Sequence, residues 1–256
     1  MQTVILCGGK GTRMREETEF RPKPLVEIGE KPMIWHIMKI YSHYGFNDFI
    51  LCVGYKGYMI KQYFMEMFWR NNDFTLNLSK AASIRYHTQG DENWKITIVD
   101  TGQETLTGGR LKKVQKYIDG DTFLFTYGDG LSDLNLNRLF AFHNAKGKLA
   151  TLTGVHPISP FGVMDVKNDE VTAFREKPVL EDMINGGFMV LDKKVFDYIP
   201  DADCSFEQEP LRSLAADNEL CVYRHDGFWT AVDTFKDIER VGELWNSGKC
   251  PWKSWD

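Results

Sequence analysis

Residues 3–13 read Thr3-Val4-Ile5-Leu6-Cys7-Gly8-Gly9-Lys10-Gly11-Thr12-Arg13 and join a short apolar run to a glycine-rich segment. The apolar run predicts a buried strand that delivers a loop to one edge of a sheet. Glycines let backbone N–H groups turn toward an anion, and Arg13 and Lys23 supply the charge that a triphosphate requires. The segment is neither a Walker loop, which ends in Gly-Lys-Ser/Thr, nor a dinucleotide fingerprint, because Met14 stands at the third glycine's place. A plain glycine turn is the alternative.

Strand-like and helix-like segments alternate along the first half of the chain. Apolar runs at residues 48–53 and 122–127 predict further buried strands, and residues 33–44 have the apolar spacing of a helix. A second helix is expected where Met59, Ile60, Tyr63, Phe64 and Met67 share one face. Residues 74–78, 84–87 and 95–100 are expected to be strands, and 136–147 a helix. This alternation favours an α/β fold with a doubly wound, mainly parallel sheet.

The second half shows shorter elements. Residues 163–167 and 171–175 flank the turn-forming pair Asn168-Asp169 and predict a β-hairpin. Strands are expected at 187–191 and 220–223, and helices at 206–217 and 235–246. Because no internal repeat or linker interrupts the sequence, we expect residues 1–256 to form a single domain.

Composition narrows the possible functions. The chain has 256 residues, 43% of them hydrophobic, and a formal net charge of -5, so we expect no nucleic-acid partner, because such partners are met by a basic surface. No run of about twenty apolar residues and no secretory signal pattern is present, which predicts a cytoplasmic protein without a membrane partner. The five cysteines are scattered singly, and neither they nor the six histidines have the spacing of a zinc site.

Two aspartates are candidates for a metal site. Asp129 lies between two glycines after the strand at 122–127, and Asp233 precedes the helix expected at 235–246. Two carboxylates that are distant in sequence can hold one Mg²⁺ if both reach the same edge of the sheet. The alternatives are a turn residue for Asp129 and a helix N-cap for Asp233.

The segment Gly-Gly-x-Gly-Thr-Arg, followed by Lys23-Pro24, resembles the signature of the sugar nucleotidylyltransferase family. The resemblance implies a Rossmann-like mixed sheet with helices on both faces and a small accessory β-hairpin region. It also implies that Arg13, Lys23 and Asp129 are catalytic, and that Asp129 and Asp233 hold Mg²⁺. The nucleotide half, about residues 1–130, would bind through Leu6, Gly8, Gly9, Lys10, Gly11, Thr12, Arg13, Lys23 and Gly128.

A sugar-phosphate half, about residues 131–256, follows from the same resemblance. Three segments match it: Phe161-Gly162-Val163, Phe174-Arg175-Glu176-Lys177-Pro178 and Asn185-Gly186-Gly187. In the family, Glu-Lys-Pro supplies a carboxylate for sugar hydroxyls and a lysine for the phosphate. The implied sugar-phosphate residues are Gly162, Glu176, Lys177, Asn185 and Gly186. A solvated ion pair between Glu176 and Lys177, with a turn at Asn185, is the alternative.

The segment from Thr101 to Arg110, Thr-Gly-Gln-Glu-Thr-Leu-Thr-Gly-Gly-Arg, is similar to the cytidylyl-transferring branch of the family. This similarity implies that Thr105 and Arg110 contact CTP, although Arg110 could instead be an ordinary residue at a helix start. The activity implied is transfer of CMP from CTP to glucose 1-phosphate, which gives CDP-glucose and pyrophosphate. In the family, CDP-glucose serves the synthesis of dideoxyhexoses of bacterial surface polysaccharides.

Two alternatives to this activity remain. One keeps the chemistry with another nucleotide or sugar, as in mannose-1-phosphate guanylyltransferases or glucose-1-phosphate thymidylyltransferases. The other is a nucleotide-binding regulatory subunit without turnover. A homo-oligomer is expected from the resemblance. The tail bearing Trp252 and Trp255 could pack on a partner subunit or on its own core.

Overall fold

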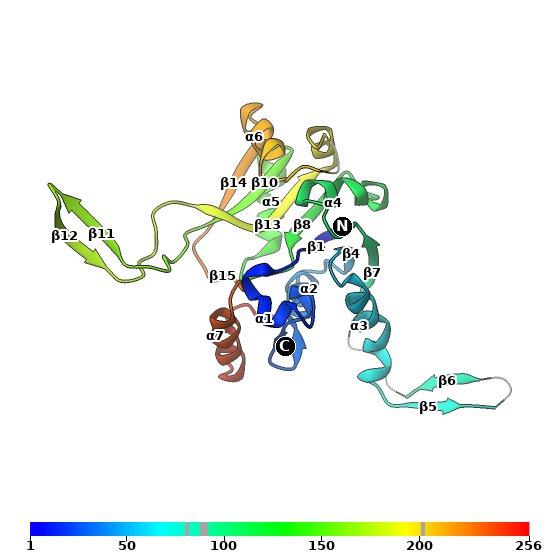
Figure 1. The fold of residues 1–256 in the computed structure, drawn as a ribbon. Coiled ribbons are helices and arrows are strands. Elements are labelled where there is room, and N and C mark those ends of the chain that lie inside the picture. The colour runs from blue at the N-terminus through cyan, green and yellow to red at the C-terminus, as the bar shows by residue number, and fades with distance from the viewer. Residues whose placement is uncertain (80–81, 88–91, 201–202, 256) are drawn as a thin grey trace.

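A computed structural model describes residues 1–79, 82–87, 92–200 and 203–255. Its centre is a seven-stranded sheet (Figure 1). In spatial order the strands are β14 (Leu220–His225), β10 (Ala150–Val155), β13 (Ile184–Asp192), β8 (Thr122–Tyr127), β1 (Gln2–Cys7), β4 (Asp48–Val53) and β7 (Lys95–Asp100). Two further pairs are short: β2 (Glu27–Ile28) with β3 (Lys31–Pro32), and β9 (Gly130–Ser132) with β15 (Trp229–Ala231).

The sheet is parallel except at one strand. β1 pairs in parallel with both β4 and β8, and β7 and β14 extend the sheet in the same direction at its edges. Only β13 runs the other way, between β8 and β10. The expected mixed but mainly parallel sheet is therefore confirmed, with one strand reversed beside the central strand that precedes Asp129.

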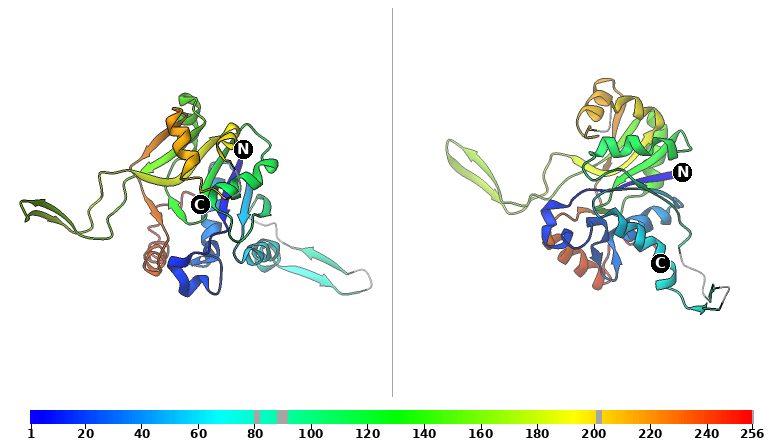
Figure 2. Two further views of the ribbon diagram at one scale, coloured as in Figure 1. Left: turned by 45° about the horizontal axis from the view of Figure 1, so that its top comes forward. Right: turned by 45° about the vertical axis from the view of Figure 1, so that its right-hand side comes forward.

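Helices cover both faces of the sheet, as expected (Figure 2). Alternate residues of β1 define the two layers: Ile5 and Cys7 belong to one core cluster, and Val4 and Leu6 to the other. The first cluster takes in α2 (Met33–His43), α5 (Leu136–Lys146) and α7 (Phe235–Asn246). The second takes in α4 (Thr107–Val114) and α6 (Glu209–Ala216). The short helical turns are α1 (Arg15–Thr18), η1 (Thr12–Met14), η2 (Lys23–Leu25), η3 (Gln115–Tyr117) and η4 (Lys193–Tyr198).

Two antiparallel ribbons project from this body (Figures 1 and 2). One is β11 (Val163–Lys167) with β12 (Glu170–Arg175), whose turn at Asn168 and Asp169 has φ values of 49° and 67°. This is the predicted hairpin. The other is β5 (Phe74–Asn77) with β6 (Ser83–Tyr86), which were expected as strands but lie outside the central sheet. Both ribbons therefore depend little on the main core.

Two helix predictions need correction. α3 (Gly57–Arg70) forms where expected, but of its five predicted core residues only Ile60 is buried, because α3 lies at the periphery of the body. α6 begins at Glu209 and not at residue 206, because the Phe206 N–H is bonded to the Thr107 hydroxyl (2.9 Å) and Pro210 sits in the first turn. Within the described ranges, no helix is both long and apolar enough to cross a membrane.

The tail at the C-terminal end packs on its own chain. Trp252 is fully buried, stacks on Phe228 and donates its Nε1–H to His36 Nδ1 (3.4 Å). His36 is also fully buried, with Nε2 2.9 Å from the Ile28 carbonyl oxygen and Trp245 against its ring. Because Nδ1 accepts a hydrogen bond from Trp252, Nε2 carries the ring hydrogen and donates to the Ile28 carbonyl oxygen, so the ring is held neutral. Of the two possible tail positions, the structure shows the one on its own core.

Burial lowers the pKa of His36 from 6.5 to about 4. Since the unfolded chain binds a proton near pH 6.5 and the folded chain only near pH 4, stability is full above pH 6.5 and falls as the pH drops toward 4. We expect a loss of about 3 kcal/mol in the free energy of unfolding from this residue between pH 7 and pH 4.

Urea unfolding at both pH values measures this loss. A His36→Gln variant is expected to lose most of that pH dependence, whereas His43→Gln, at the exposed end of the same helix, should keep it. An unchanged pH dependence in His36→Gln would contradict this assignment.

Candidate functional site

A cavity of about 360 Å³ opens beyond the carboxyl ends of β1 and β8. Most of the residues predicted to bind nucleotide line it: Leu6, Gly8, Gly9, Gly11, Thr12, Arg13, Lys23, Thr105, Arg110 and Gly128. Asp129 and Asp233 line it too. Lys10 lies on the same loop and pairs across to Glu104 at 2.7 Å. The cavity lies at the edge where parallel α/β sheets bind ligands.

The glycine loop takes its shape from two close approaches. Gly11 has φ +61°, and a Cβ placed there would lie 2.6 Å from Thr18 Cγ2. At Gly8, an added Cβ would overlap the Arg110 guanidinium, 2.0 Å from Nη1. The Thr18 hydroxyl also bonds the Gly11 carbonyl oxygen at 3.1 Å. Glycine is therefore required at both positions for the loop to lie against its supports.

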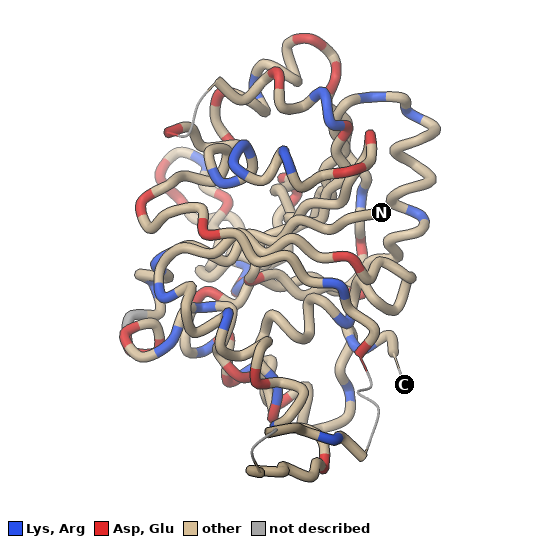
Figure 3. Tube along the Cα trace, turned by 90° about the vertical axis from the view of Figure 1, so that its right-hand side faces the viewer, with Lys and Arg blue, Asp and Glu red and all other residues tan. Residues whose placement is uncertain are grey.

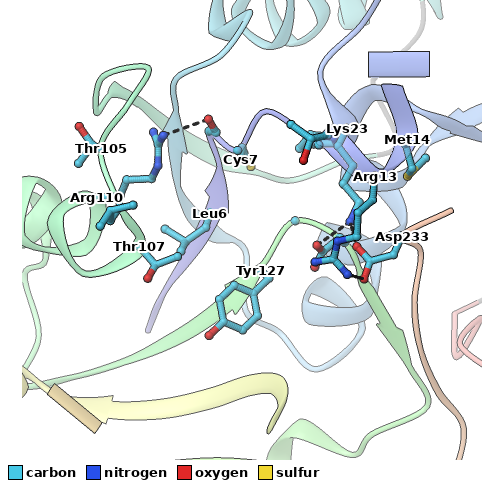
Figure 4. A pocket seen from close by; sticks show the side chains of 18 of the residues that line it. Leu6, Cys7, Arg13, Met14, Lys23, Thr105, Thr107, Arg110, Tyr127 and Asp233 are labelled. Carbon is cyan, nitrogen blue, oxygen red and sulfur yellow. Dashed lines mark hydrogen bonds and ion pairs between the residues drawn. The ribbon is translucent and has the colours of Figure 1, made fainter. Parts of the chain in front are cut away.

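Asp129 and Asp233 both contact Lys23, and Figure 4 shows Lys23 and Arg13 beside Asp233. Lys23 Nζ lies 2.8 Å from Asp129 Oδ2 and 2.6 Å from Asp233 Oδ1. Arg13 Nη1 lies 2.6 Å from Asp233 Oδ2. The Lys23 side chain is only 11% exposed, whereas that of Arg13 is 75% exposed. Four charged side chains from the two ends and the middle of the chain thus form one ion-pair cluster in the cavity wall.

A small antiparallel sheet brings the acids together. Asp129 stands between β8 and β9, and Asp233 follows β15 by two residues. Gly130 pairs with Ala231 across these strands, and the Val232 N–H donates to the Asp129 carbonyl oxygen at 2.9 Å. The register of β9 with β15 therefore fixes the separation of the two carboxylates.

The start of α7 orients Asp233. Thr234, not Asp233, is the N-cap, and it forms a capping box with Asp237. The Asp237 Oδ2 atom also accepts from the Asp233 N–H at 3.2 Å. The alternative prediction, that Asp233 is the N-cap of the last helix, is therefore wrong. The Asp233 carboxylate points to Lys23 and Arg13 instead.

The acid pair has the composition of a site for a hard divalent cation. One oxygen of Asp129 and one oxygen of Asp233 contact the same atom, Lys23 Nζ, so the two carboxylates face a common point. Among the described residues, no group of three or more histidine, cysteine or acidic side chains is placed to hold a metal. Two carboxylates without further protein ligands suit Mg²⁺, which keeps waters and takes substrate phosphate oxygens.

Arg110 is buried between two loops and is only 4% exposed. Its Nη2 donates to the carbonyl oxygens of Gly8 (3.0 Å) and Gln103 (3.2 Å). Its Nη1 donates to the Thr101 hydroxyl and the Gly102 carbonyl oxygen, both at 2.7 Å. Burial lowers the pKa of this guanidinium from its usual value. Arg110 thus joins the glycine loop to the loop before α4, and its contact with CTP stays a prediction.

A hydrogen-bonded group of Glu207, Tyr127 and Thr107 lies beside the cavity and was not predicted from the sequence. Glu207 accepts from the Tyr127 hydroxyl and from the Thr107 hydroxyl, both at 2.5 Å. Tyr127 and Thr107 both line the cavity, and burial, together with Glu207, raises the pKa of Tyr127. The position of Tyr127 at the carboxyl end of a predicted central strand is the signal that could have found it.

The predicted sugar-phosphate residues fall into two groups. Asn185 donates from Nδ2 to the Tyr127 hydroxyl at 3.4 Å, which places it beside the cavity, and the Gly186 carbonyl oxygen accepts from Trp229 Nε1 at 2.7 Å. Gly162, Glu176 and Lys177 lie at the root of the β11–β12 ribbon and do not line the cavity. Glu176 and Lys177 are 3.9 Å apart and both more than 60% exposed. Their sugar-phosphate role stays a prediction.

The sheet and the position of its cavity define a Rossmann-like α/β protein with a ligand-sized crevice at the strand ends. The family model described as "Nucleotidyl transferase" matches residues 2–246. The chain belongs to this family.

Two relatives are similar to the chain in sequence, and one solved structure is similar to it in fold. It is 52% identical, over the full length of both chains, to a Bacillus subtilis (strain 168) protein named "Probable glucose-1-phosphate cytidylyltransferase". It is 48% identical, again over both full lengths, to the glucose-1-phosphate cytidylyltransferase of Salmonella typhimurium (strain LT2). The structure of HddC from Yersinia pseudotuberculosis is similar in fold, with a TM-score of 0.69, 23% identity, and coverage of 95% of this chain and 99% of that one.

Proposed function

We propose that this protein transfers CMP from CTP to α-D-glucose 1-phosphate and releases CDP-glucose and pyrophosphate. The two relatives at 52% and 48% identity, both named as glucose-1-phosphate cytidylyltransferases, support this substrate pair. The observation that carries the proposal is the meeting of Asp129 and Asp233 with Lys23 and Arg13 beside the glycine loop. The arrangement supplies both the ligands for a phosphate-bound cation and the positive charge for a departing pyrophosphate.

Mg²⁺ is the cofactor of this proposal, with Asp129 and Asp233 as its protein ligands. When bound, it would neutralise charge on the α-phosphate and draw it toward the sugar phosphate. The choice of Mg²⁺ is supported by the donor set, which consists of two carboxylates on one cavity wall.

The chain's own residues have separate tasks in the reaction. A phosphate oxygen of glucose 1-phosphate attacks the α-phosphorus of CTP, and the bond from that phosphorus to the oxygen of pyrophosphate breaks. Negative charge builds on the transferred and departing groups, so Arg13 and Lys23 stabilise them by being held in place beforehand. Lys177 aligns the attacking phosphate and Glu176 binds sugar hydroxyls in this proposal, with Asn185 and Gly186 closing the sugar pocket.

An assay panel tests the substrates. Purified protein with Mg²⁺ is given CTP, UTP, dTTP or GTP, each with glucose 1-phosphate or mannose 1-phosphate, and pyrophosphate and nucleotide sugar are measured. CDP-glucose is expected to be the dominant product. Preference for GTP with mannose 1-phosphate, or for dTTP, would keep the chemistry and overturn the substrate assignment. Pyrophosphate release from no pair would favour a regulatory nucleotide-binding subunit.

The proposal extends to the setting of the protein. Cys7, Cys52, Cys221 and Cys250 form no disulfide, which is usual in a reducing compartment, and we assign the protein to the cytoplasm. Figure 3 shows basic and acidic positions interspersed on both sides of the sheet, which favours small-molecule substrates over nucleic acid. The product would serve bacterial surface polysaccharides, including the O-antigen of lipopolysaccharide.

A homo-oligomer is the final part of the proposal, and the two ribbons support it. Apolar side chains on both ribbons, among them Leu76, Ile84, Val166 and Phe174, are 48–61% exposed in a single chain. Two-stranded ribbons are only marginally stable alone, so a second copy that covers them would stabilise both. Light scattering after size-exclusion chromatography measures the assembly, and a monomer at working concentration would contradict it.

A further inference from the structure

Lys23 occupies the position between the two acids that a bridging cation needs. Its ammonium contacts the inner oxygens of both carboxylates at 2.6–2.8 Å. A Mg²⁺ ion bound by the same oxygens would lie about 2.0–2.1 Å from each. Two cations held on those same oxygens repel each other strongly in a partly buried site. The contact of Lys23 with the acids therefore competes with the binding of a metal by both acids.

The net charge of the group formed by Lys23, Arg13, Asp129 and Asp233 also disfavours metal binding in the free protein. Two carboxylates face one ammonium and one guanidinium, so the group is neutral as it stands. A divalent cation that enters this neutral group gains little attraction. With Lys23 and the acids only partly exposed, at 11% and 25–34%, water screens these charges less than it would at the surface.

The glycine loop offers Lys23 another partner. The Lys23 stem runs alongside it, since a Cβ placed on Gly11 would lie 3.3 Å from Lys23 Cβ. Lysine has a flexible four-carbon stem, so its ammonium can move from the acids to phosphate oxygens on that loop by rotation of the side chain. A bound triphosphate would then draw Lys23 away and bring the negative charge that favours a divalent cation.

From these observations, which rest on the proposed function for the metal and the triphosphate, we propose that Lys23 is a tethered countercation. In the free enzyme it holds Asp129 and Asp233 together and keeps a divalent cation out. Binding of the triphosphate releases the acids, so metal and nucleotide bind cooperatively, each raising the affinity for the other. Lys23 thus sets the order in which the site is filled, in addition to its part in the reaction.

Binding of Mn²⁺ alone tests this role without turnover. Free Mn²⁺ is followed by its electron paramagnetic resonance signal in titrations of the nucleotide-free protein. Wild type is expected to bind weakly, and Lys23→Met about tenfold more tightly or better, within the roughly 5- to 150-fold range of such couplings. Lys23→Gln should behave alike. Lys10→Met removes a positive charge from the neighbouring loop without uncovering the acids, and it is expected to bind Mn²⁺ as wild type does.

The outcomes separate this role from the proposed function. If Asp233→Asn added to Lys23→Met abolishes the gain, the metal lies at the acid pair. If both Lys23 variants keep the wild-type unfolding temperature and bind Mn²⁺ no more tightly, the countercation role is wrong. Tight Mn²⁺ binding at the acids of nucleotide-free wild type would overturn it without any variant. Formation of CDP-glucose by the same wild-type preparation with Mg²⁺ shows separately whether the proposed function holds.

Discussion

Asp129→Asn is expected to lower kcat/KM for CTP and glucose 1-phosphate by about 100-fold or more, because it removes the charge of one of the two carboxylates proposed to hold the Mg²⁺ that neutralises the reacting phosphates. Asparagine keeps the size of the side chain and changes only its charge. The backbone of Asp129 should stay in place, since its carbonyl oxygen accepts from the Val232 N–H and the strand pair beside it persists. The loss would therefore come from chemistry and not from unfolding.

Steady-state kinetics over a range of Mg²⁺ concentrations, with thermal unfolding alongside, measure this effect. Asp119→Asn is a matched control, because Asp119 is an exposed aspartate that does not line the cavity. It should leave turnover unchanged. Near-normal turnover in Asp129→Asn at every Mg²⁺ concentration would remove Asp129 from the catalytic group.

Arg110→Met is expected to lower the free energy of unfolding by about 3 kcal/mol or more. Its guanidinium bonds three carbonyl oxygens and a hydroxyl at 2.7–3.2 Å, and a methionine would leave these acceptors buried without a donor. The Gly8 carbonyl oxygen is one of them. We therefore also expect weaker CTP binding, as a consequence of a loosened glycine loop.

Urea unfolding and CTP titration of the same variant distinguish support of the loop from direct contact with the nucleotide. Arg212→Met, on the exposed face of α6, is the control and should change stability by less than about 0.5 kcal/mol. If Arg110→Met kept wild-type stability and lost only CTP affinity, direct contact would be its main role.

The central layers of the fold could be predicted because their signals are local. β1, β4 and β8 are continuous apolar runs, and α2 and α7 show clear helical spacing, so type and order follow from short stretches of sequence. The five apolar residues of α3 show the limit of this reasoning. Spacing shows that side chains share a face, but their burial depends on what packs there, which is decided by distant parts of the chain.

The candidate site shows the same division. The glycine loop, Arg13 and Lys23 lie close together in the sequence, so a sequence motif could predict that they line one cavity. The Glu207 contacts with Tyr127 and Thr107 join segments that are 80 and 100 residues apart, and no local pattern indicates them. The inward direction of Arg110 was equally hidden, because an arginine in the first turn of a helix is usually solvated.

The reversed strand β13 has an architectural consequence for the segment that carries three of the proposed sugar-phosphate residues, Gly162, Glu176 and Lys177. Because β10 ends and β13 begins at the edge of the sheet that bears the cavity, the whole connection between them, residues 156–183, leaves and returns beside the ligand crevice. Its length and side chains can diverge without disturbing any pairing of the central strands. The insert, which carries Gly162, Glu176 and Lys177 of the proposed sugar-phosphate site, is thus free to vary while the cavity-lining loops at the strand ends remain as they are.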